Sequence, residues 1–350
     1  MLLAEIDRGS GWAGNKLPSE RELAQTYGTS RTSVRQAIET LVQEGVLVRG
    51  VGKGTFVVES YKERHKPIEA TTGSENRTLA FVVREDIFQF VEPGVTRILV
   101  GAQKACQDSG YRLLFQTATD GLSEVGSDIG GCIVVGGAPR RLLDNMHTAG
   151  KPVVLVDLLQ DDSTAAVGFD YAGGMRQAMS YLHNLGHRRI GFVGFPNTEK
   201  YVAYWQSLAG FGIRYQPELV IFLEQSDLQP AIMSGYRVMQ KMLADGHLPT
   251  AIIATNDLVA FGMMDALELA GVAVPGQVSV IGFDDLGWET SRPLTTVRVD
   301  AGAAGALAVE VMLERIQGGG ESQPRITVPT ELVIRESAAP PHKGWSEQDQ

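Results

Sequence analysis

The sequence is poor in the features that mark secreted, membrane-anchored or metal-bound proteins. Its 350 residues include only two cysteines, Cys106 and Cys132, with no CxxC pair and no histidine at zinc-ligand spacing. The first ten residues, MLLAEIDRGS, include Glu5 and Asp7 and lack the sustained apolar run of a signal peptide or membrane anchor. We therefore expect two buried thiols, no metal, no cofactor, no contact with a membrane and a cytoplasmic location.

Signatures of catalysis are also missing. The chain has no GxSxG, HExxH, Walker or dinucleotide-binding motif, and its serine, histidine and acidic residues do not gather in a recognisable pattern. The stretch GVGKGT at residues 50–55 lacks the Walker spacing of four residues between the first glycine and Gly-Lys. We expect no catalytic residue and no enzymatic activity, which leaves a binding function.

Charge is distributed unevenly along the chain. The net charge is −10, yet residues 1–66 hold ten Lys/Arg and eight Asp/Glu, which gives this segment +2 and the remainder −12. Proteins that bind polyanions usually present a basic face. Any contact with nucleic acid is therefore expected in the N-terminal segment alone.

The sequence pattern changes near residue 78. Residues 1–59 are helical in pattern and finish in a short β-like stretch, and residues 60–77 have the charge, proline and glycine of a linker. From residue 78, short apolar strands alternate with helical stretches, which indicates an α/β fold of parallel sheets covered on both faces. About 260 residues of this pattern predict two lobes. Residues 338–350 are expected to form a disordered tail.

Two short helices with a tight turn between them are predicted near the N-terminus. Ser19 and Glu22 form a capping box after Leu-Pro, which predicts a helix over residues 19–27, and Gly28 supplies the turn. A second helix is expected over residues 30–44, with one apolar stripe. The alternating stretches VLVRG and TFVVE that follow predict a β-hairpin around the turn VGKG.

The polar face of the second helix presents Arg31, Thr32 and Arg35. A pair of helices whose second member carries arginines and hydroxyls near its N-terminus is the arrangement that enters a DNA major groove. Arginine can bond guanine in a bidentate way, and hydroxyls can hold phosphates. Lys53 at the hairpin turn is free to approach a phosphate or the minor groove. The alternative is that these arginines form an ordinary solvated helix face.

The segment LPSERELAQTYGTSRTSVRQAIETLVQEGVLVRGVGKGTFV closely resembles the GntR-family winged helix-turn-helix over nearly the complete motif. The resemblance implies contact with double-stranded operator DNA. Together with Lys53, the positions expected to contact DNA are Arg21, Ser30, Arg31, Thr32, Ser33, Arg35, Gly52 and Gly54. The family's first helix usually begins further upstream than Met1 allows, so we expect either a shortened helix or a misassigned start.

Three later segments resemble the LacI/GalR effector domain, a periplasmic-binding-protein-like (type I) fold. They are AVGFDYAGGMRQAMSYLHNLGHRRIGFVG, AIIATNDLVAFGMMDALELAGVAVPGQVSVIGFDD and RPLTTVRVD, and the likeness covers roughly residues 78–337. A GntR reader joined to a LacI-type sensor is the layout of arabinose-repressor-like proteins, which this chain resembles. The family geometry implies an effector held between two lobes. These are a first lobe of about 78–186 and 295–320 and a second lobe of about 187–294 and 321–337.

Polar residues follow the strands whose carboxyl ends should meet at this cleft. Asp157 closes PVVLVD, Asn256 follows AIIAT, and Asp284 closes VSVIGF. Carboxylates and amides can bond adjacent hydroxyls, which suits a polyol, and Asn256 and Asp284 also match family effector contacts. Lys200 replaces an arginine that is common in sugar-binding members. The residues expected to contact the effector are Asp86, Phe88, Asp157, Lys200, Asn256, Asp284 and Trp288.

Structural alternatives accompany these assignments. Asp157 could simply terminate its strand, and Asp257 and Asp285 are expected to cap the helices that follow them. The aromatic residues Tyr201, Tyr204 and Trp205 could face the cleft or belong to the core. His187 matches a structural position of the family. The stretch TATDGLSEVGSDIG at residues 117–130 leaves little room for the helix that normally joins the second and third strands.

Together these expectations describe a DNA-binding transcription regulator, a homodimeric repressor whose operator affinity is controlled by a small sugar-like effector. Two alternatives stay open. One is an exported solute-binding protein with the same sensor fold, and the other is a regulator that senses a non-sugar ligand such as a nucleoside or purine.

Overall fold

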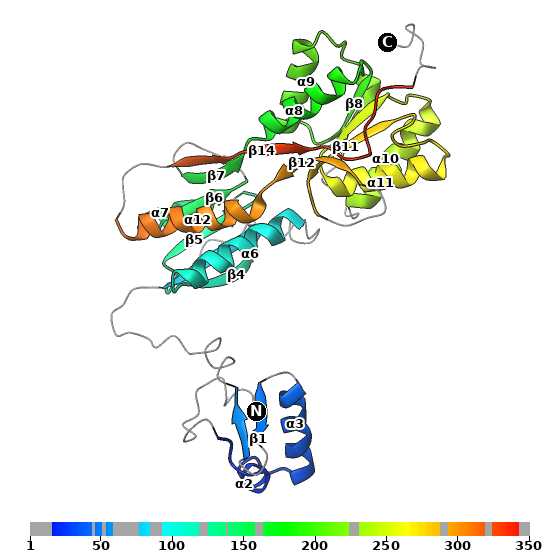
Figure 1. Cartoon of the computed structure of the whole chain (residues 1–350). Coiled ribbons are helices and arrows are strands. Elements are labelled where there is room, and N and C mark those ends of the chain that lie inside the picture. Colours follow the sequence, from blue (N-terminus) through cyan, green and yellow to red (C-terminus); the bar gives the residue numbers. More distant parts are fainter. Residues whose placement is uncertain are drawn as a thin grey trace. The chain divides into compact units, whose positions relative to one another are not determined.

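The computed structural model describes eleven segments of the chain. They are residues 16–43, 46–50, 54–58, 77–84, 93–118, 125–137, 139–157, 164–223, 231–287, 293–318 and 324–342. The chain divides into two compact units, Met1–Ser74 and Glu75–Gln350 (Figure 1). Among the described helices, none has the length and apolar character needed to cross a membrane.

The first unit contains a helix pair and a hairpin. Helices α2 (Glu20–Thr26) and α3 (Arg31–Gln43) are followed by the antiparallel strands β1 (Leu47–Gly50) and β2 (Gly54–Val57). A small core joins them, because both helices and both strands contribute buried side chains. This core consists of Leu17, Leu23, Ala24, Val34, Ile38, Leu41, Val46, Leu47 and Val57. The winged helix-turn-helix predicted from the sequence is therefore confirmed.

Local signals set the ends of these helices. Ser19 Oγ accepts a hydrogen bond from the Glu22 amide at 3.3 Å, and Glu22 Oε2 accepts one from the Ser19 amide at 2.7 Å. This is the predicted capping box, and it starts α2 one residue after Ser19. Gly28, with φ of 59°, makes the turn between the two helices. The first helix expected upstream lies outside the described residues.

The second unit contains two six-stranded sheets, each belonging to one lobe. The first sheet is wholly parallel, with the order β13-β7-β6-β5-β3-β4. Its strands are β3 (Thr78–Arg84), β4 (Arg112–Ala118), β5 (Gly131–Val135), β6 (Val153–Val156), β7 (Ala165–Phe169) and β13 (Arg325–Val328). Its helices are α6 (Pro93–Asp108), α7 (Arg140–Thr148) and α12 (Ala301–Ile316).

The second sheet has the order β14-β12-β11-β10-β8-β9 and is parallel except for β14, which runs antiparallel to β12. Its strands are β8 (Ile190–Gly194), β9 (Val220–Phe222), β10 (Ala251–Ala254), β11 (Ser279–Asp284), β12 (Thr295–Val299) and β14 (Thr330–Val333). Its helices are α8 (Tyr171–Asn184), α9 (Glu199–Gly210), α10 (Ala231–Asp245), α11 (Asp257–Leu269) and the short 3-10 turn η2 (Pro217–Leu219).

Strand β3 shows why the strands of this unit are continuous apolar runs in the sequence. Leu79, Phe81 and Val83 pack in the cluster that contains residues of α6 and α12, whereas Ala80 and Val82 pack in the cluster that contains residues of α7. All five side chains are fully buried. Helices therefore cover both faces of the sheet, as the sequence pattern predicted.

Within the described residues, the chain passes between the lobes three times, and each crossing follows the end of a strand. It leaves β7 for α8, β12 for α12 and β13 for β14. We expected residues 295–320 in the first lobe, but β12 hydrogen-bonds to β11 in the second sheet and only α12 packs in the first lobe. We also expected residues 321–337 in the second lobe, but β13 pairs with β7 in the first. An apolar strand pattern predicts burial but does not identify the sheet that the strand joins.

Candidate functional site

The candidate DNA-reading face is formed by Arg21 of α2 and the first turns of α3. The predicted positions on these two helices are all exposed, namely Arg21, Ser30, Arg31, Thr32, Ser33 and Arg35. The guanidinium of Arg35 donates to both carboxylate oxygens of Glu20 over 2.9–3.2 Å. This hydrogen-bonded pair lowers the pKa of the Glu20 carboxyl. Arg35 is thus held across the two helices by a residue that our sequence analysis did not single out.

Two of the predicted DNA contacts also have a structural role at the start of α3. Ser30 Oγ accepts a hydrogen bond from the Ser33 amide at 3.1 Å, and the hydroxyls of the two residues lie 2.9 Å apart. These hydroxyls satisfy groups at the helix N-terminus before any phosphate arrives. At the wing, Gly52 and Lys53 lie outside the described residues. Gly54 has φ of 115°, a conformation that favours glycine.

A second candidate site is a cavity of about 480 Å³ between the two lobes of the second unit, Glu75–Gln350, which we call the sensor unit below. It brings together Asp157, Lys200, Asn256 and Asp284, four of the residues predicted to contact the effector. Asp157 and Asn256 follow β6 and β10, Asp284 ends β11, and Lys200 lies in the first turn of α9, the helix after β8. The cavity therefore lies at the carboxyl ends of strands from both sheets. The other three predicted residues, Asp86, Phe88 and Trp288, lie outside the described residues.

Tyr171 connects the polar groups of this cavity across the lobes. It begins α8, directly after the chain has left the first sheet, and its hydroxyl donates to the Asp157 carboxylate. The Lys200 ammonium lies 4.4 Å from the centroid of the Tyr171 ring and 4.5 Å from that of Phe283. It also donates to the Thr255 carbonyl oxygen at 2.8 Å. One aromatic ring thus links an acidic group of the first lobe to a basic group of the second.

Asn256 has two possible uses in this geometry. It lines the cavity, and its Oδ1 accepts a hydrogen bond from the Val259 amide at 2.8 Å, which makes Asn256 the N-cap of α11. Asp257, which we expected to cap that helix, is instead buried within its first turn. Its carboxylate accepts from the Leu286 amide at 2.9 Å and from the Thr296 hydroxyl. Burial raises the pKa of Asp257 to about 6, against the lowering effect of these hydrogen bonds.

Asp285 is not a helix cap either; its carboxylate forms ion pairs within the second lobe. Its carboxylate lies 2.8 Å from Arg298 Nε and 2.6 Å from an Arg335 guanidinium nitrogen. Burial alone would raise the pKa of Asp285, but the two arginines hold it below the ordinary value. Both expected caps were therefore wrong, and both carboxylates hold the loop after β11 in place.

The structure also adds residues that the sequence analysis missed. Those lining the cavity include Arg97, Phe169, Tyr171, Phe195, Thr198, Glu199 and Thr255. Phe169 and Phe195 end or follow strands, so the rule that found Asp157 could have found them as well. Arg97 lies in helix α6, where no strand end signals a cleft.

Of the aromatic and histidine alternatives, Tyr204 and His187 have structural roles, whereas Trp205 is half-exposed and does not belong to the core. Tyr204 is fully buried and donates to the Ile190 carbonyl oxygen at 2.8 Å, and neither it, Tyr201 nor Trp205 lines the cavity. His187 is buried as well, and its ring nitrogens lie 3.0 Å from the Thr250 hydroxyl and 2.8 Å from the Ala339 carbonyl oxygen. It therefore ties the start of the second lobe to Ala339, which also bonds Ser279, so the expectation of a disordered tail from residue 338 was wrong for residues 338–342.

Comparisons with known proteins cover both units. Residues 1–57 match the bacterial regulatory proteins of the gntR family, and residues 179–338 match the periplasmic binding protein-like domain. The HTH-type transcriptional repressor PurR of Escherichia fergusonii is 30% identical over 263 residues, which cover 69% of this chain and 75% of that protein. The arabinose metabolism transcriptional repressor of Geobacillus stearothermophilus is 28% identical over 363 residues, 96% of this chain and 95% of that protein.

Among solved structures, the complex of the transcriptional regulator CelR with cellobiose has a TM-score of 0.65 and 23% identity. The match covers 92% of this chain and 100% of that chain. The likeness supports the α/β fold with an N-terminal helix-turn-helix and a two-lobed domain. All three proteins are named as transcriptional regulators, in agreement with the expectation of a non-enzymatic chain.

Proposed function

Since this chain belongs to the transcription regulators that join a GntR-type DNA-binding domain to a LacI-type periplasmic-binding-protein-like domain, we propose that a small sugar-like effector controls its affinity for operator DNA. The observation that carries the proposal is the cavity in which Asp157, Lys200, Asn256 and Asp284 converge from both lobes. An effector held there contacts two lobes at once and so favours one arrangement of them.

The chemistry of the cavity suits a polyol. Asp157 and Asp284 offer carboxylate oxygens as acceptors, Lys200 and Asn256 offer N–H donors, and the Tyr171 ring offers an apolar face. Adjacent hydroxyls on a sugar both donate and accept, so they can satisfy such a mixed set. The arabinose repressor and the cellobiose complex are relatives whose names point to the same class.

A purine or nucleoside is the second candidate effector. It is favoured by the aromatic side chains Phe169, Tyr171 and Phe195 in the cavity. A flat base can stack on such rings. The carboxylates of Asp157 and Asp284 argue against a purine, since a polyol has more hydroxyl groups that can donate hydrogen bonds to them.

We further propose that the regulator is a homodimeric repressor that binds a two-fold operator through Arg21, Ser30, Arg31, Thr32, Ser33 and Arg35, with Gly52, Lys53 and Gly54 at the wing. One short winged helix offers little surface for tight binding, whereas two related copies read two half-sites. Arg31 and Arg35 are the candidates for base contacts, because guanine accepts bidentate bonds from arginine.

A thermal-shift screen of the full chain tests the effector class. The compounds are L-arabinose, other pentoses, hexoses, cellobiose, sugar acids, nucleosides and free purines. A ligand at 100 times its Kd stabilises the folded protein by about 2.7 kcal/mol, which raises the melting temperature measurably. We expect a sugar to give this shift and to change operator affinity in the same concentration range.

The Asp284→Asn variant is the control for this screen. A compound that binds in the cavity should shift the variant less than the wild type, whereas a general solvent effect shifts both equally. A shift given by purines or nucleosides alone would replace the sugar with the second candidate. A shift by sugars that Asp284→Asn leaves unchanged would move the binding site away from this cavity.

A further inference from the structure

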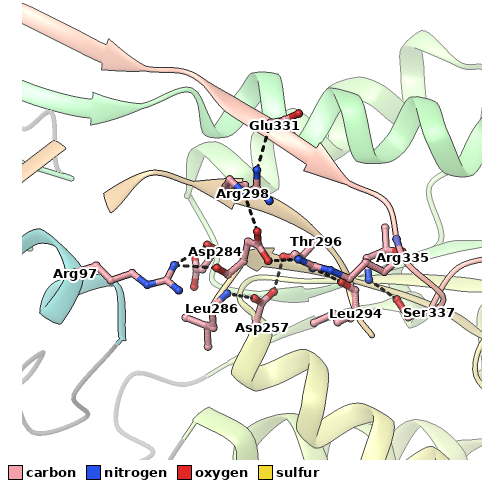
Figure 2. A network of polar contacts seen from close by, with 12 residues as sticks. Arg97, Asp257, Asp284, Leu286, Leu294, Thr296, Arg298, Glu331, Arg335 and Ser337 are labelled. Atoms are coloured by element: carbon pink, nitrogen blue, oxygen red, sulfur yellow. Dashed lines mark hydrogen bonds and ion pairs between the residues drawn. The ribbon is translucent and has the colours of Figure 1, made fainter. Parts of the chain in front are cut away.

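Arg97 reaches from the first lobe to the main chain of the second (Figure 2). It lies in α6 and lines the cavity, and its Nη1 donates to the carbonyl oxygen of Asp285 at 2.9 Å and to that of Asp284 at 3.4 Å. Both acceptors are backbone atoms at the carboxyl end of β11. A charged donor on a neutral carbonyl is a stronger hydrogen bond than a neutral pair.

The main chain that Arg97 holds is in a conformation that needs support. Asp284 has φ of 107° and Asp285 has φ of 49°, two consecutive non-glycine residues in the left-handed region. Such residues persist only where their surroundings hold them in place. The second lobe supplies part of that support, because Arg298 and Arg335 bind the Asp285 carboxylate. Arg97 adds support from the opposite lobe.

We propose that Arg97 is a cross-lobe positioning residue of the effector site, which holds Asp284 toward the cavity and stabilises the closed arrangement of the lobes. The inference rests on the proposed function for the part played by Asp284 in binding. Its physical basis is that opening the cleft separates α6 from the loop after β11, so both hydrogen bonds must break. Because the acceptors are carbonyl groups, the interaction depends on the side chain of residue 97 alone.

The interaction gives a ligand a direct way to influence the lobes. Arg97 and Asp284 both line the cavity, and Arg97 bonds the carbonyl of Asp284 itself. A molecule that engages the Asp284 side chain therefore acts on the segment that Arg97 holds. Effector binding and lobe closure become one linked equilibrium, in which each favours the other.

Single-molecule energy transfer on the effector-free full chain tests the proposal. Dyes are attached to cysteines introduced at Arg140 of the first lobe and Leu269 of the second, whose side chains are 86% and 77% exposed. The native Cys106 and Cys132 are buried, and burial raises the pKa of their thiols to about 11 and about 12, so they compete little for the dyes. An excess of unlabelled chain ensures one labelled protomer per dimer.

Arg97→Met should reduce the ratio of closed to open molecules by roughly 10-fold or more, the loss expected for a charge-assisted hydrogen bond. Arg97→Lys should restore part of that ratio, because an ammonium can bond one carbonyl but lacks the planar fork. Lys104→Met is the matched control. It lies on the same helix, forms an exposed pair with Asp108 and should leave the distribution unchanged.

The experiment separates this proposal from the effector assignment, since no ligand is present. An Arg97→Met distribution equal to that of the wild type overturns the positioning role, and so does an equal shift in Lys104→Met. If circular dichroism shows that Arg97→Met does not fold, Arg97→Lys decides the matter. An unchanged distribution in that variant then overturns the proposal, and a several-fold loss of closed molecules supports it.

Discussion

The two units of this chain use charged side chains in opposite ways. In the first unit, Arg35 and Glu20 form an ion pair at the surface, with 57% and 26% of their side chains exposed. In the second unit, the carboxylate side chain of Asp285 is only 9% exposed and is held by two arginines, and Asp257 is almost fully buried. The surface pair joins neighbouring helices, whereas the buried acids join segments that are distant in sequence.

This difference follows from what each unit must do. An exposed ion pair contributes little to stability, so Arg35, if it contacts DNA as we propose, gives up its pair with Glu20 at little loss. A buried carboxylate that loses its charged partner is much more costly, so the ion pairs of Asp285 fix the loop after β11 firmly, while Asp257 holds it through the Leu286 amide. Charge is available for binding in the DNA-reading unit, and it maintains shape in the sensor unit.

Replacing the buried Asp257 should change the stability of the folded protein more than the other substitutions below, and the size of this change should depend on pH. The pKa of Asp257 is raised to about 6 in the folded protein from its ordinary value of 3.8. The folded state therefore favours the neutral acid. The stabilisation it provides is fully present below about pH 3.8 and is lost as pH rises through 6, a loss of about 3 kcal/mol.

Asp257→Asn should remove this pH dependence. Its amide can still accept from the Leu286 amide and can donate to the Thr296 hydroxyl, so the variant should be more stable than the wild type at pH 8. The advantage should shrink at pH 4. Urea unfolding at both pH values measures it, with Asp108→Asn on the exposed face of α6 as control. The same stability difference at pH 4 and pH 8 would show that charge burial is not the cause.

Asp284→Asn should weaken effector binding without affecting the DNA-reading unit. A charge-assisted hydrogen bond contributes about 1.5–3 kcal/mol, so its loss should lower effector affinity roughly 10- to 150-fold. Operator affinity without effector should stay the same. Calorimetric titration with the sugar identified by the thermal-shift screen measures the first quantity, and operator binding measures the second. Asn256 both lines the cavity and caps α11. The Asn256→Asp variant removes its amide donor but keeps an oxygen to cap α11, so it separates loss of the effector contact from loss of the helix cap.

Sequence predicted best what depends on neighbouring residues. The capping box of Ser19 and Glu22, the turn at Gly28 and the hairpin all follow from residues a few positions apart, and the structure confirms them. The cavity could also be placed, because Asp157 and Asp284 stand at the carboxyl ends of apolar strands in the two parallel sheets, the edge at which ligands of such sheets bind.

What sequence did not predict depends on contacts between distant segments. Residues 295–299 were assigned to the wrong lobe. They form β12, and the apolar pattern of this strand does not reveal that it hydrogen-bonds to β11. Asp257 looked like a helix cap by position, yet its partners are Leu286 and Thr296. Arg97 was overlooked because a single arginine on a helix gives no sign of a carbonyl 188 residues later.

In the DNA-reading unit, Arg35→Ala should reduce discrimination between operator and other DNA. Loss of one bidentate base contact costs about 1–3 kcal/mol at the specific site. The loss of the Glu20 pair adds little, since that pair is exposed. Competition binding at one fixed salt concentration measures the ratio of specific to non-specific affinity. Arg140→Ala in the sensor unit is the control. Equal weakening on all sequences, with a smaller salt slope, would reassign Arg35 to a phosphate contact.

The smallest expected effect is local to α2, where Ser19→Ala removes one half of the capping box. The methyl group cannot accept the hydrogen bond from the Glu22 amide, which lies 3.3 Å from Ser19 Oγ. Loss of such a cap costs about 1 kcal/mol, so peptides covering Glu20–Thr26 should exchange their amide hydrogens about fivefold faster. Mass spectrometry of the full chain measures this rate. Glu22→Gln is the matched variant, because glutamine can also accept from the Ser19 amide and should change exchange less. An effect that spread to the sensor unit would contradict the view that this unit is organised by neighbouring residues.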